Sequence, residues 1–391
     1  MKMRYIKLLL SFLIVLAPLA ATAQPALIPA PPQLAAKSWI LMDANSGEVI
    51  TEHNADERLP PASLTKLMTS YVLSYWLENG QVSNDDMVTV SKNAWAQNPI
   101  FNGSSLMWIE VGKQVSIGEL HRGIVVSSGN DACVAVAEYI AGSEASFAQV
   151  MNQHAVRLGM KNSHFVNSHG LPDDDHYSSA RDMAILSRAI LDYPAEYDLY
   201  KEKEFTYNGI RQTNRNRLLW SDPSVDGLKT GHTDAAGYCL VSSAEREGMR
   251  LISVVMGTKS ESARERETQR LLAYGFRFFE THHLYTAGTE LSKTRVWKGA
   301  ADEVSLGVKE EVFLTIPRGQ HDQLDATLSV DEVLTAPIRE GQEYGELVVS
   351  LDGKELVRSP LIALQDVEQG GLVKRLWDAI VLFVLNLIGQ K

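Results

Sequence analysis

The stretch Pro61-Ala62-Ser63-Leu64-Thr65-Lys66-Leu67-Met68-Thr69 begins a segment whose pattern predicts an amphipathic helix. Apolar residues recur there at steps of three and four, namely Leu64, Leu67, Met68, Tyr71, Val72, Tyr75 and Trp76. Pro60 and Pro61 precede the segment and Gly80 closes it, as is typical of helix ends. Lys66 lies next to the apolar stripe and shares a helix face with Ser63, three residues earlier. Core packing alone does not explain an ammonium group beside a hydroxyl at the edge of a core.

The composition of the whole chain limits the classes of function. Its 391 residues are too many for one average domain and fit two. Hydrophobic residues make up 45% and charged residues 22%, which is ordinary for a globular protein. The net charge of -11 argues against an electrostatic nucleic-acid footprint, so no nucleic-acid partner is expected.

The N-terminus has the pattern of a targeting segment. Lys2, Arg4 and Lys7 precede an apolar run from Leu8 to Ala20, and Ala21-Thr22-Ala23 provides a small-x-small cleavage site. Residues 1–23 are therefore predicted to be a secretory signal peptide. The alternative is a retained membrane anchor, but that needs about 20 apolar residues. Residues 24–36 form a proline-rich lead, expected to be an extended linker.

The pattern of the remaining chain predicts two domains. In residues 37–285, a hairpin is expected at 37–53, helices near 117–126, 131–141, 144–158 and 180–191, antiparallel strands over 225–257, and a helix from Arg264 to His283. Short β-type runs dominate residues 286–366, and Asp352-Gly353 is typical of a hairpin turn. The second region is therefore expected to be a small β-sandwich or β-barrel.

Metal and cofactor sites find little support in the sequence. There is no H-E-x-x-H and no paired C-x-x-C, and the acidic run Asp173–His176 lacks EF-hand spacing, which favours a solvated loop. Cys133 and Cys239 could pair in an exported protein, but free buried thiols are favoured. No metal and no organic cofactor are expected.

Ser63 and Lys66 are a chemically sensible nucleophile and base. A serine hydroxyl attacks poorly unless a base takes its proton. A lysine can be that base when burial or a nearby cation lowers its pKa. The S-x-x-K pattern is weak by itself, since one or two matches are expected by chance in about 400 residues.

Two further elements strengthen the case for a site. Ser128-Gly129-Asn130 follows an apolar segment and precedes a predicted helix, and Lys229-Thr230-Gly231 lies on a predicted strand. Each has a structural alternative: Ser128 and Asn130 could cap the helix, and Lys229 could be an exposed strand residue. The order S-x-x-K, S-x-N, K-T-G is nevertheless the motif set of the active-site-serine enzymes that recognise penicillin.

With these motifs, the chain resembles the low-molecular-mass penicillin-binding proteins, the serine-type D-alanyl-D-alanine carboxypeptidases. The resemblance covers nearly everything after the signal peptide, including the segments 61–66, 103–107, 127–133, 178–183 and 226–233. It implies an α/β (α+β) catalytic domain, with an antiparallel sheet flanked by helices, followed by a small all-β domain. It also implies peptidoglycan stem peptides ending in D-Ala-D-Ala as substrates and β-lactam antibiotics as acylating ligands.

The resemblance also implies roles for the motif residues in catalysis. Ser63 attacks the carbonyl between the two D-alanines, and Lys66 is the base. Ser128 relays a proton to the leaving nitrogen, and Asn130 holds the substrate amide and orients Lys66. The backbone N–H groups of Ser63 and His232 stabilise the oxyanion.

The remaining candidate residues bind the substrate. Lys229 and Thr230 of the K-T-G element, with Gly231 beside them, and Arg264 are implied to receive the terminal carboxylate. The charge of Lys229 would also help to keep Lys66 neutral. Ser104, Ser105 and His169 are weaker candidates, expected to line the cleft.

Other functions remain open from the sequence alone. A β-lactamase of class A uses a glutamate for deacylation, but Asn162–Asn167 offers none, and Glu204, four residues before Asn208, is far downstream. A transpeptidase or an endopeptidase is the next enzymatic alternative. A non-catalytic cell-wall-binding scaffold is the alternative of a different class, although it would need none of the motif residues.

The C-terminal residues 370–391 predict an amphipathic helix. Lys374, Arg375 and Asp378 fall on one side, and residues such as Trp377 and Ile380 on the other. The uninterrupted apolar run, 379–385, is far shorter than the about 20 residues of a membrane span. The helix is therefore expected to lie in a membrane interface, and its alternative is packing on the second domain. With the signal peptide, this predicts an exported protein, peripheral on the periplasmic side of the bacterial inner membrane.

Overall fold

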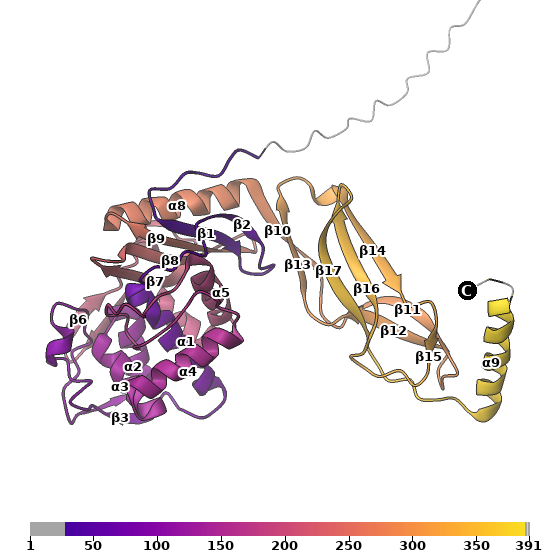
Figure 1. Ribbon diagram of the computed structural model, residues 1–391, viewed down its shortest axis with the longest axis horizontal. Helices are drawn as coiled ribbons and strands as arrows, with labels where there is room; N and C mark the ends of the chain where they lie inside the picture. Colours follow the sequence, from indigo (N-terminus) through magenta and orange to yellow (C-terminus); the bar gives the residue numbers. More distant parts are fainter. Residues whose placement is uncertain (1–27, 388, 390–391) are drawn as a thin grey trace, which may run out of the picture.

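The computed structural model describes residues 28–387 and 389. A rounded unit of helices and sheet is followed by an elongated β-rich unit and then by a helix at the far end (Figure 1). The predicted signal peptide, residues 1–23, and the first part of the proline-rich lead lie outside the described residues.

A five-stranded antiparallel sheet is the centre of the first unit. Its order is β2-β1-β9-β8-β7, so strands that are far apart in the sequence lie side by side. The strands are β1 (Ser38–Asp43), β2 (Val49–His53), β7 (Val225–Thr233), β8 (Gly237–Arg246) and β9 (Met249–Thr258). Strand β7 lies at one edge, and one side of its backbone is therefore not used by the sheet.

Helices cover both faces of this sheet. Trp39 and Leu41 of β1 pack in a core with helix α8 (Glu261–Phe278), whereas Ile40 and Met42 pack in the core of the helices below. The alternation follows from the two-residue period of a strand. Figure 1 shows α8 above the sheet and α1 to α5, which lie within residues 65–190, beneath it. Because both faces are covered, β1 is buried along its whole length.

Most of the helices predicted from the sequence lie below the sheet. The helices there are α1 (Thr65–Glu78), α2 (Ile117–Arg122), α3 (Asn130–Ala141), α4 (Glu144–Arg157), α5 (Ala180–Ile190) and α6 (Pro194–Tyr197). The short α7 (Leu218–Ser221) packs instead in the core that contains α8. Two short antiparallel pairs of strands complete the unit, β3 (Met87–Thr89) with β4 (Gln114–Ser116), and β5 (Glu204–Tyr207) with β6 (Ile210–Thr213). The helix predicted at 117–126 is divided, because a π-helical turn, η3 (Gly123–Ser127), follows α2.

The helix predicted from Arg264 to His283 is wrong at both ends. It begins at Glu261, where the side chain of Ser260 caps it by accepting from the backbone N–H of Ala263 at 3.1 Å. It ends at Phe278, because the following residues form β10 (Phe279–Tyr285), which pairs with β13 (Val312–Pro317). Pairing with a strand about thirty residues later overrides the local helical pattern.

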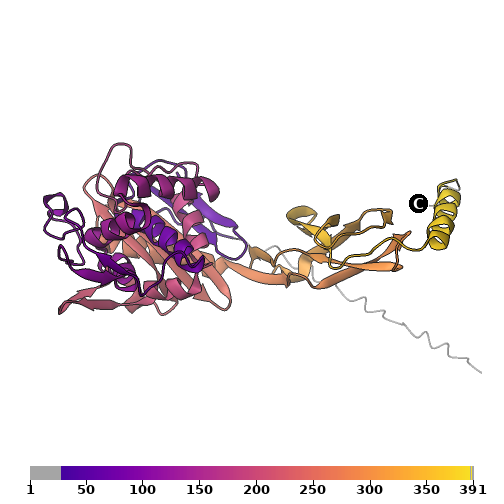
Figure 2. The same ribbon diagram turned by 90° about the horizontal axis from the view of Figure 1, so that it is seen from below.

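The second unit is all-β, as predicted. Its six-stranded sheet has the order β14-β16-β17-β12-β11-β15, next to the ribbon of β10 and β13. Figure 2 shows how this unit extends from the first. Its other strands are β11 (Glu290–Trp297), β12 (Glu303–Val308), β14 (Leu324–Val330), β15 (Leu334–Thr335), β16 (Glu343–Leu351) and β17 (Lys354–Ala363).

A buried polar cluster joins the two units. The carboxylate of Asp43, at the end of β1, accepts from Thr281 Oγ1 of β10 at 2.6 Å. Thr315 of β13 lies 3.0 Å from Thr281 and 2.6 Å from the hydroxyl of Ser46. Asp43 is fully buried, and its carboxylate also accepts from the backbone N–H groups of Asn45 and Ser46 and from the Ser46 hydroxyl, so its charge is satisfied by hydrogen bonds. The cluster ties the first hairpin to the β10–β13 ribbon.

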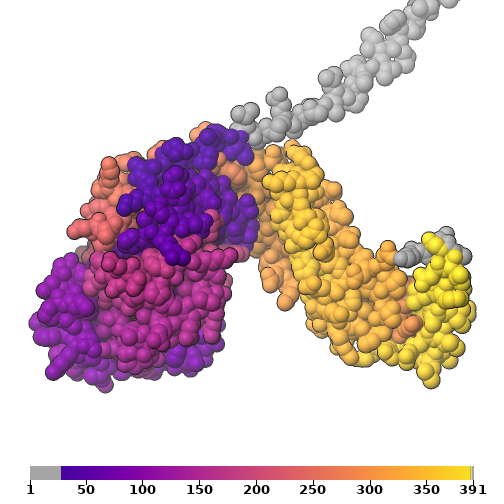
Figure 3. All heavy atoms as spheres, in the orientation of Figure 1, coloured from indigo at the N-terminus to yellow at the C-terminus, as the bar shows by residue number. Residues whose placement is uncertain are grey.

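The C-terminal helix α9 (Leu372–Leu387) stands at the end of the β-rich unit that is away from the first unit (Figure 3). Its polar side touches that unit: buried Asp378 accepts from the backbone N–H of Lys298 at 2.6 Å, and Lys374 forms an ion pair with Asp302. Its apolar residues are exposed, namely Leu372, Val373, Leu376, Trp377, Ile380, Phe383, Val384 and Leu387. Among the described residues, no helix is long and apolar enough to cross a membrane.

Candidate active site

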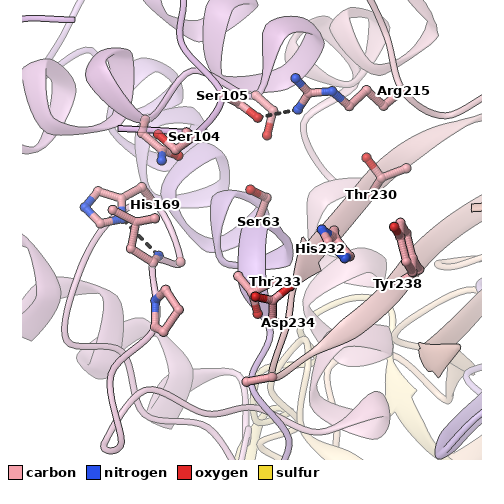
Figure 4. Close-up of a pocket in the computed structure, with 18 of the residues that line it drawn as sticks. Ser63, Ser104, Ser105, His169, Arg215, Thr230, His232, Thr233, Asp234 and Tyr238 are labelled. Carbon is pink, nitrogen blue, oxygen red and sulfur yellow. Dashed lines mark hydrogen bonds between the residues drawn. The ribbon is translucent and has the colours of Figure 1, made fainter. Parts of the chain in front are cut away.

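Ser63 lies at the point where α1 approaches the edge strand β7. It sits in a 3₁₀ turn, η1 (Ala62–Leu64), immediately before α1. Its side chain lines a cleft of about 680 Å³ between the helices and the sheet. Figure 4 shows Ser63 in the middle of this cleft, with labelled residues from several elements around it.

Lys66 is buried behind Ser63. The sequence predicted a position at the edge of the core, and this is wrong: the side chain is 1% exposed and lies inside the core. Its Nζ lies 3.0 Å from Ser63 Oγ, 2.6 Å from Asn130 Oδ1 and 2.6 Å from the backbone carbonyl of His169. Three separate elements therefore hold one ammonium group.

Burial lowers the pKa of Lys66 to about 8, because a charged ammonium is poorly solvated there. Among nearby charges, Cys133 and Asp131 oppose the shift, and the guanidinium of Arg215 adds to it. Lys66 is therefore partly neutral near neutral pH, which an exposed lysine is not.

The S-x-N element forms the second side of the site. Ser128 follows the π-helical turn η3 with a left-handed φ of 58°, and Asn130 is the first residue of α3. Gly129 is the N-cap of α3, with no side-chain cap, so the capping interpretation of Ser128 and Asn130 is wrong. A Cβ at Gly129 would lie 2.9 Å from Asp131 Oδ1 and from the backbone nitrogen of Met107, which explains the glycine.

The K-T-G element lies on β7 and closes the third side. Lys229 is buried, and its Nζ donates to Ser128 Oγ at 3.0 Å. Its pKa is well below the usual value because of burial, with repulsion from Lys66, Arg215 and Arg264 as a further cause. A Cβ at Gly231 would lie 2.9 Å from the carbonyl oxygen of Pro61, so glycine lets β7 approach η1 closely.

The weaker candidates also lie at the cleft. The Ser104 hydroxyl donates to the carbonyl of Phe101 at 2.7 Å, and Ser105 accepts from Arg215. The candidate residues that line the cleft are Ser63, Ser104, Ser105, Ser128, Asn130, His169, Thr230, Gly231, His232 and Arg264. Lys66 and Lys229 lie behind this surface, where Lys66 donates to Ser63, Asn130 and His169 and Lys229 donates to Ser128 and the carbonyl of Thr230.

Sequence reasoning missed two residues of the cleft. Arg215 comes from the segment between β6 and α7, where no motif marks it, and Figure 4 shows its guanidinium at the rim beside Ser105. Tyr238 of β8 stacks on His232 with ring centroids 3.9 Å apart. Only the cross-strand register of β7 and β8 brings this pair together, and that register was not predicted.

Metal ligands and disulfides do not contribute to the site as described. Among residues 28–387, no group of three or more His, Cys, Asp and Glu side chains could hold a metal ion. His176, in the acidic run, is buried, and its Nε2 lies 2.7 Å from Thr65 Oγ1. Cys133 and Cys239 are both free and buried, and burial raises the pKa of Cys239 to about 11.

Comparison with known proteins identifies the family. A family model described as D-alanyl-D-alanine carboxypeptidase matches residues 25–260, more than half of the chain. The chain belongs to this family. A second model, the C-terminal domain of penicillin-binding protein 5, matches residues 279–369.

Individual relatives agree with this assignment. D-alanyl-D-alanine carboxypeptidase DacA of Escherichia coli (strain K12) is 49% identical over 367 residues, which cover 93% of this chain and 91% of that protein. DacC of the same strain is 48% identical over 376 residues, covering 95% and 94%. The crystal structure of penicillin binding protein 5 from Haemophilus influenzae superposes with a TM-score of 0.83 at 46% identity, covering 87% of this chain and 100% of that one.

Proposed function

We propose that this chain is a serine-type D-alanyl-D-alanine carboxypeptidase that removes the terminal D-alanine from peptidoglycan stem pentapeptides through an acyl-enzyme on Ser63. One observation carries the proposal: Ser63 Oγ faces the cleft 3.0 Å from Lys66 Nζ, and the pKa of Lys66 is lowered to about 8. Membership of the carboxypeptidase family supports the reaction and the substrate.

The acylation step uses Ser63 as nucleophile and Lys66 as base. Neutral Lys66 accepts the hydroxyl proton while Ser63 Oγ bonds to the carbonyl carbon between the two D-alanines. Asn130 Oδ1 and the carbonyl of His169 keep Lys66 Nζ beside Ser63 Oγ. The C–N bond then breaks, and the proton that Lys66 took from Ser63 passes to the departing nitrogen through the hydroxyl of Ser128, which Lys229 contacts. Water hydrolyses the resulting ester.

The oxyanion of the tetrahedral intermediate needs fixed donors. The proposed donors are the backbone N–H groups of Ser63 and His232. Two features favour this: β7 is the edge strand of its sheet, and Gly231 brings it close to the carbonyl of Pro61. The same free edge suits an extended peptide substrate that pairs with β7 by main-chain hydrogen bonds.

The terminal carboxylate of the substrate is expected among the cations of the cleft. Arg264 is 2% exposed, and its Nε has no hydrogen-bond partner among the described atoms. Lys229 lies nearby and Thr230 offers a hydroxyl in the cleft. The ion pair of Arg264 with Glu261 is long, at 3.9 Å, so a substrate carboxylate would supply a closer counter-charge to this buried guanidinium. A β-lactam carries a comparable carboxylate beside a reactive carbonyl and is proposed to acylate Ser63 in the same way.

The proposed membrane contact uses the exposed apolar face of α9. Its polar side is held by the second domain through Asp378 and Lys374, so the apolar side is directed away from that contact. A face of this kind suits the boundary between lipid headgroups and acyl chains, with Trp377 at headgroup level. Together with the predicted signal peptide, this supports a peripheral protein on the periplasmic side of the inner membrane.

Replacing the nucleophile tests the proposed function. Ser63→Ala should abolish covalent labelling by a fluorescent penicillin and D-alanine release from a pentapeptide, because no other oxygen takes the place of Oγ. The melting temperature should stay close to that of the wild type, since the side chain faces the cleft. If the wild-type protein turns penicillin over rapidly, it is a β-lactamase. If it shows neither penicillin labelling nor D-alanine release, it is a non-catalytic scaffold. Full labelling of Ser63→Ala would exclude Ser63 as the nucleophile.

The lowered pKa of Lys66 predicts a pH dependence of acylation. The base form predominates above a pKa of about 8, so the acylation rate constant should rise about tenfold per pH unit below that value and level off above it. Lys66→Arg keeps the charge but gives up no proton in this range, so acylation should fall by about 10²- to 10⁴-fold. Stopped-flow penicillin acylation measures both. A flat wild-type profile between pH 6 and pH 8, or normal acylation by Lys66→Arg, would exclude Lys66 as the base.

Removing the C-terminal helix tests the membrane contact. A chain ending at residue 369 should leave the membrane fraction yet keep penicillin labelling and D-alanine release, since α9 lies far from α1 and β7, the elements that carry the site (Figure 1). The full-length mature protein is the matched control and should fractionate with membranes. A full-length protein that is wholly soluble, or a truncation that unfolds the first domain, would contradict the proposal.

A further inference from the structure

Glu144, whose side chain is 29% exposed, makes contacts that neither its helix nor the proposed chemistry requires. It is the first residue of α4, whose N-cap is Ser143, so the capping role belongs to its neighbour. The carboxylate of Glu144 instead reaches the segment Ser168–His169. It accepts from the backbone N–H of Ser168 at 3.0 Å and from the Ser168 hydroxyl at 2.7 Å.

A third donor to Glu144 follows from the tautomer of His169. Burial lowers the pKa of His169 to about 3, so its ring is neutral at physiological pH. Its Nδ1 accepts from the backbone N–H of Leu171 at 3.1 Å, so the single ring proton is on Nε2. That Nε2 lies 3.2 Å from Glu144 Oε1. Glu144 therefore binds the segment through the backbone N–H and hydroxyl of Ser168 and through the ring N–H of His169.

The carbonyl groups of the same segment bind α1. The carbonyl of His169 accepts from Lys66 Nζ at 2.6 Å, and that of Ser168 accepts from Thr69 Oγ1 at 2.5 Å. Next to them, Gly170 packs so closely that a Cβ there would lie 1.8 Å from the carbonyl oxygen of Ala62. The segment is thus fixed between Glu144 on α4 and the turn of α1 that carries Lys66.

We propose that Glu144 is a positioning residue for Lys66, acting through the segment Ser168–His169, in which the carbonyl of His169 holds the Lys66 ammonium. This inference rests on the proposed function of Lys66 as base. Without Glu144, the segment loses its anchor on α4, and Lys66 Nζ loses a fixed acceptor that keeps it beside Ser63 Oγ. Acylation then slows, because a small displacement of a reacting group is costly. Binding of the unreacted ligand is unaffected, because Glu144 does not line the cleft as described.

The experiment measures penicillin acylation of the full chain by stopped flow, separating the dissociation constant of the initial complex from the acylation rate constant over a range of pH. Glu144→Ala should lower the plateau rate constant at high pH by about 10- to 100-fold, with the dissociation constant changed by less than about twofold. The midpoint of the pH profile should fall, because the charged form of Lys66 loses an acceptor and a nearby negative charge.

Ser143→Ala is the matched control. It removes the N-cap of the same helix, whose hydroxyl accepts from the N–H of Ser146 at 3.1 Å, but touches neither Ser168 nor His169. It should lower the melting temperature while leaving the plateau and the midpoint at wild-type values. A merely structural role of Glu144 predicts that Glu144→Ala behaves like Ser143→Ala, and that result would overturn the proposal.

Glu144→Gln keeps the proposal testable if Glu144→Ala does not fold. All three contacts of Glu144 are to the one oxygen Oε1, so the amide oxygen of Glu144→Gln in that place still accepts from Ser168 and His169, and only the negative charge is lost. The plateau should therefore stay within about twofold of the wild type, with the midpoint again lowered because a negative charge near Lys66 is lost. A wild-type midpoint in Glu144→Gln would overturn the proposal. If the wild-type protein itself is not acylated at Ser63, the proposed function fails first, and the positioning of Lys66 has no reaction to serve.

Discussion

The buried ammonium group of Lys66 is the constraint on which the site depends. A lysine that is 1% exposed is costly to charge, and its three acceptors offset that cost. They come from η1, from the start of α3 and from the segment after α4, which are far apart in the sequence. Burial of Lys66 therefore requires these three parts of the first domain to pack around it. The same burial lowers the pKa of Lys66 and makes it a usable base.

The sheet supplies the site with a free strand edge and with Lys229. Strand β7 ends the sheet and leaves one edge of its backbone available next to Ser63. Gly231 permits the close approach of β7 to η1, and Lys229 links β7 to Ser128. The cleft therefore has catalytic groups on its helical side and an extended backbone with cations on the other. An extended peptide with a terminal carboxylate matches this division.

Short-range patterns in the sequence were enough to predict much of this. The three motifs led to the family, and the helical stripe after Ser63, the strands of residues 225–257 and the all-β second domain are present in the structure. Features that depend on distant contacts were not predictable. Helix α8 stops at Phe278 because β10 pairs with β13. Lys66 is fully buried because Asn130 of α3 and His169 come to its ammonium from distant parts of the chain. Arg215 and Glu144 lie in no motif, since their partners Ser105 and Ser168 come from other parts of the chain.

The central claim is that Lys66 loses its proton near neutral pH, which an NMR titration of the folded protein labelled with ¹³C at the lysine side chains measures directly. Comparison with Lys66→Arg assigns the Lys66 resonance. The account predicts a midpoint of about 8 for that resonance, because burial disfavours the charged form. A midpoint near the ordinary lysine value of about 10.4 would contradict it, because Lys66 would then remain charged beside Ser63 throughout the physiological range.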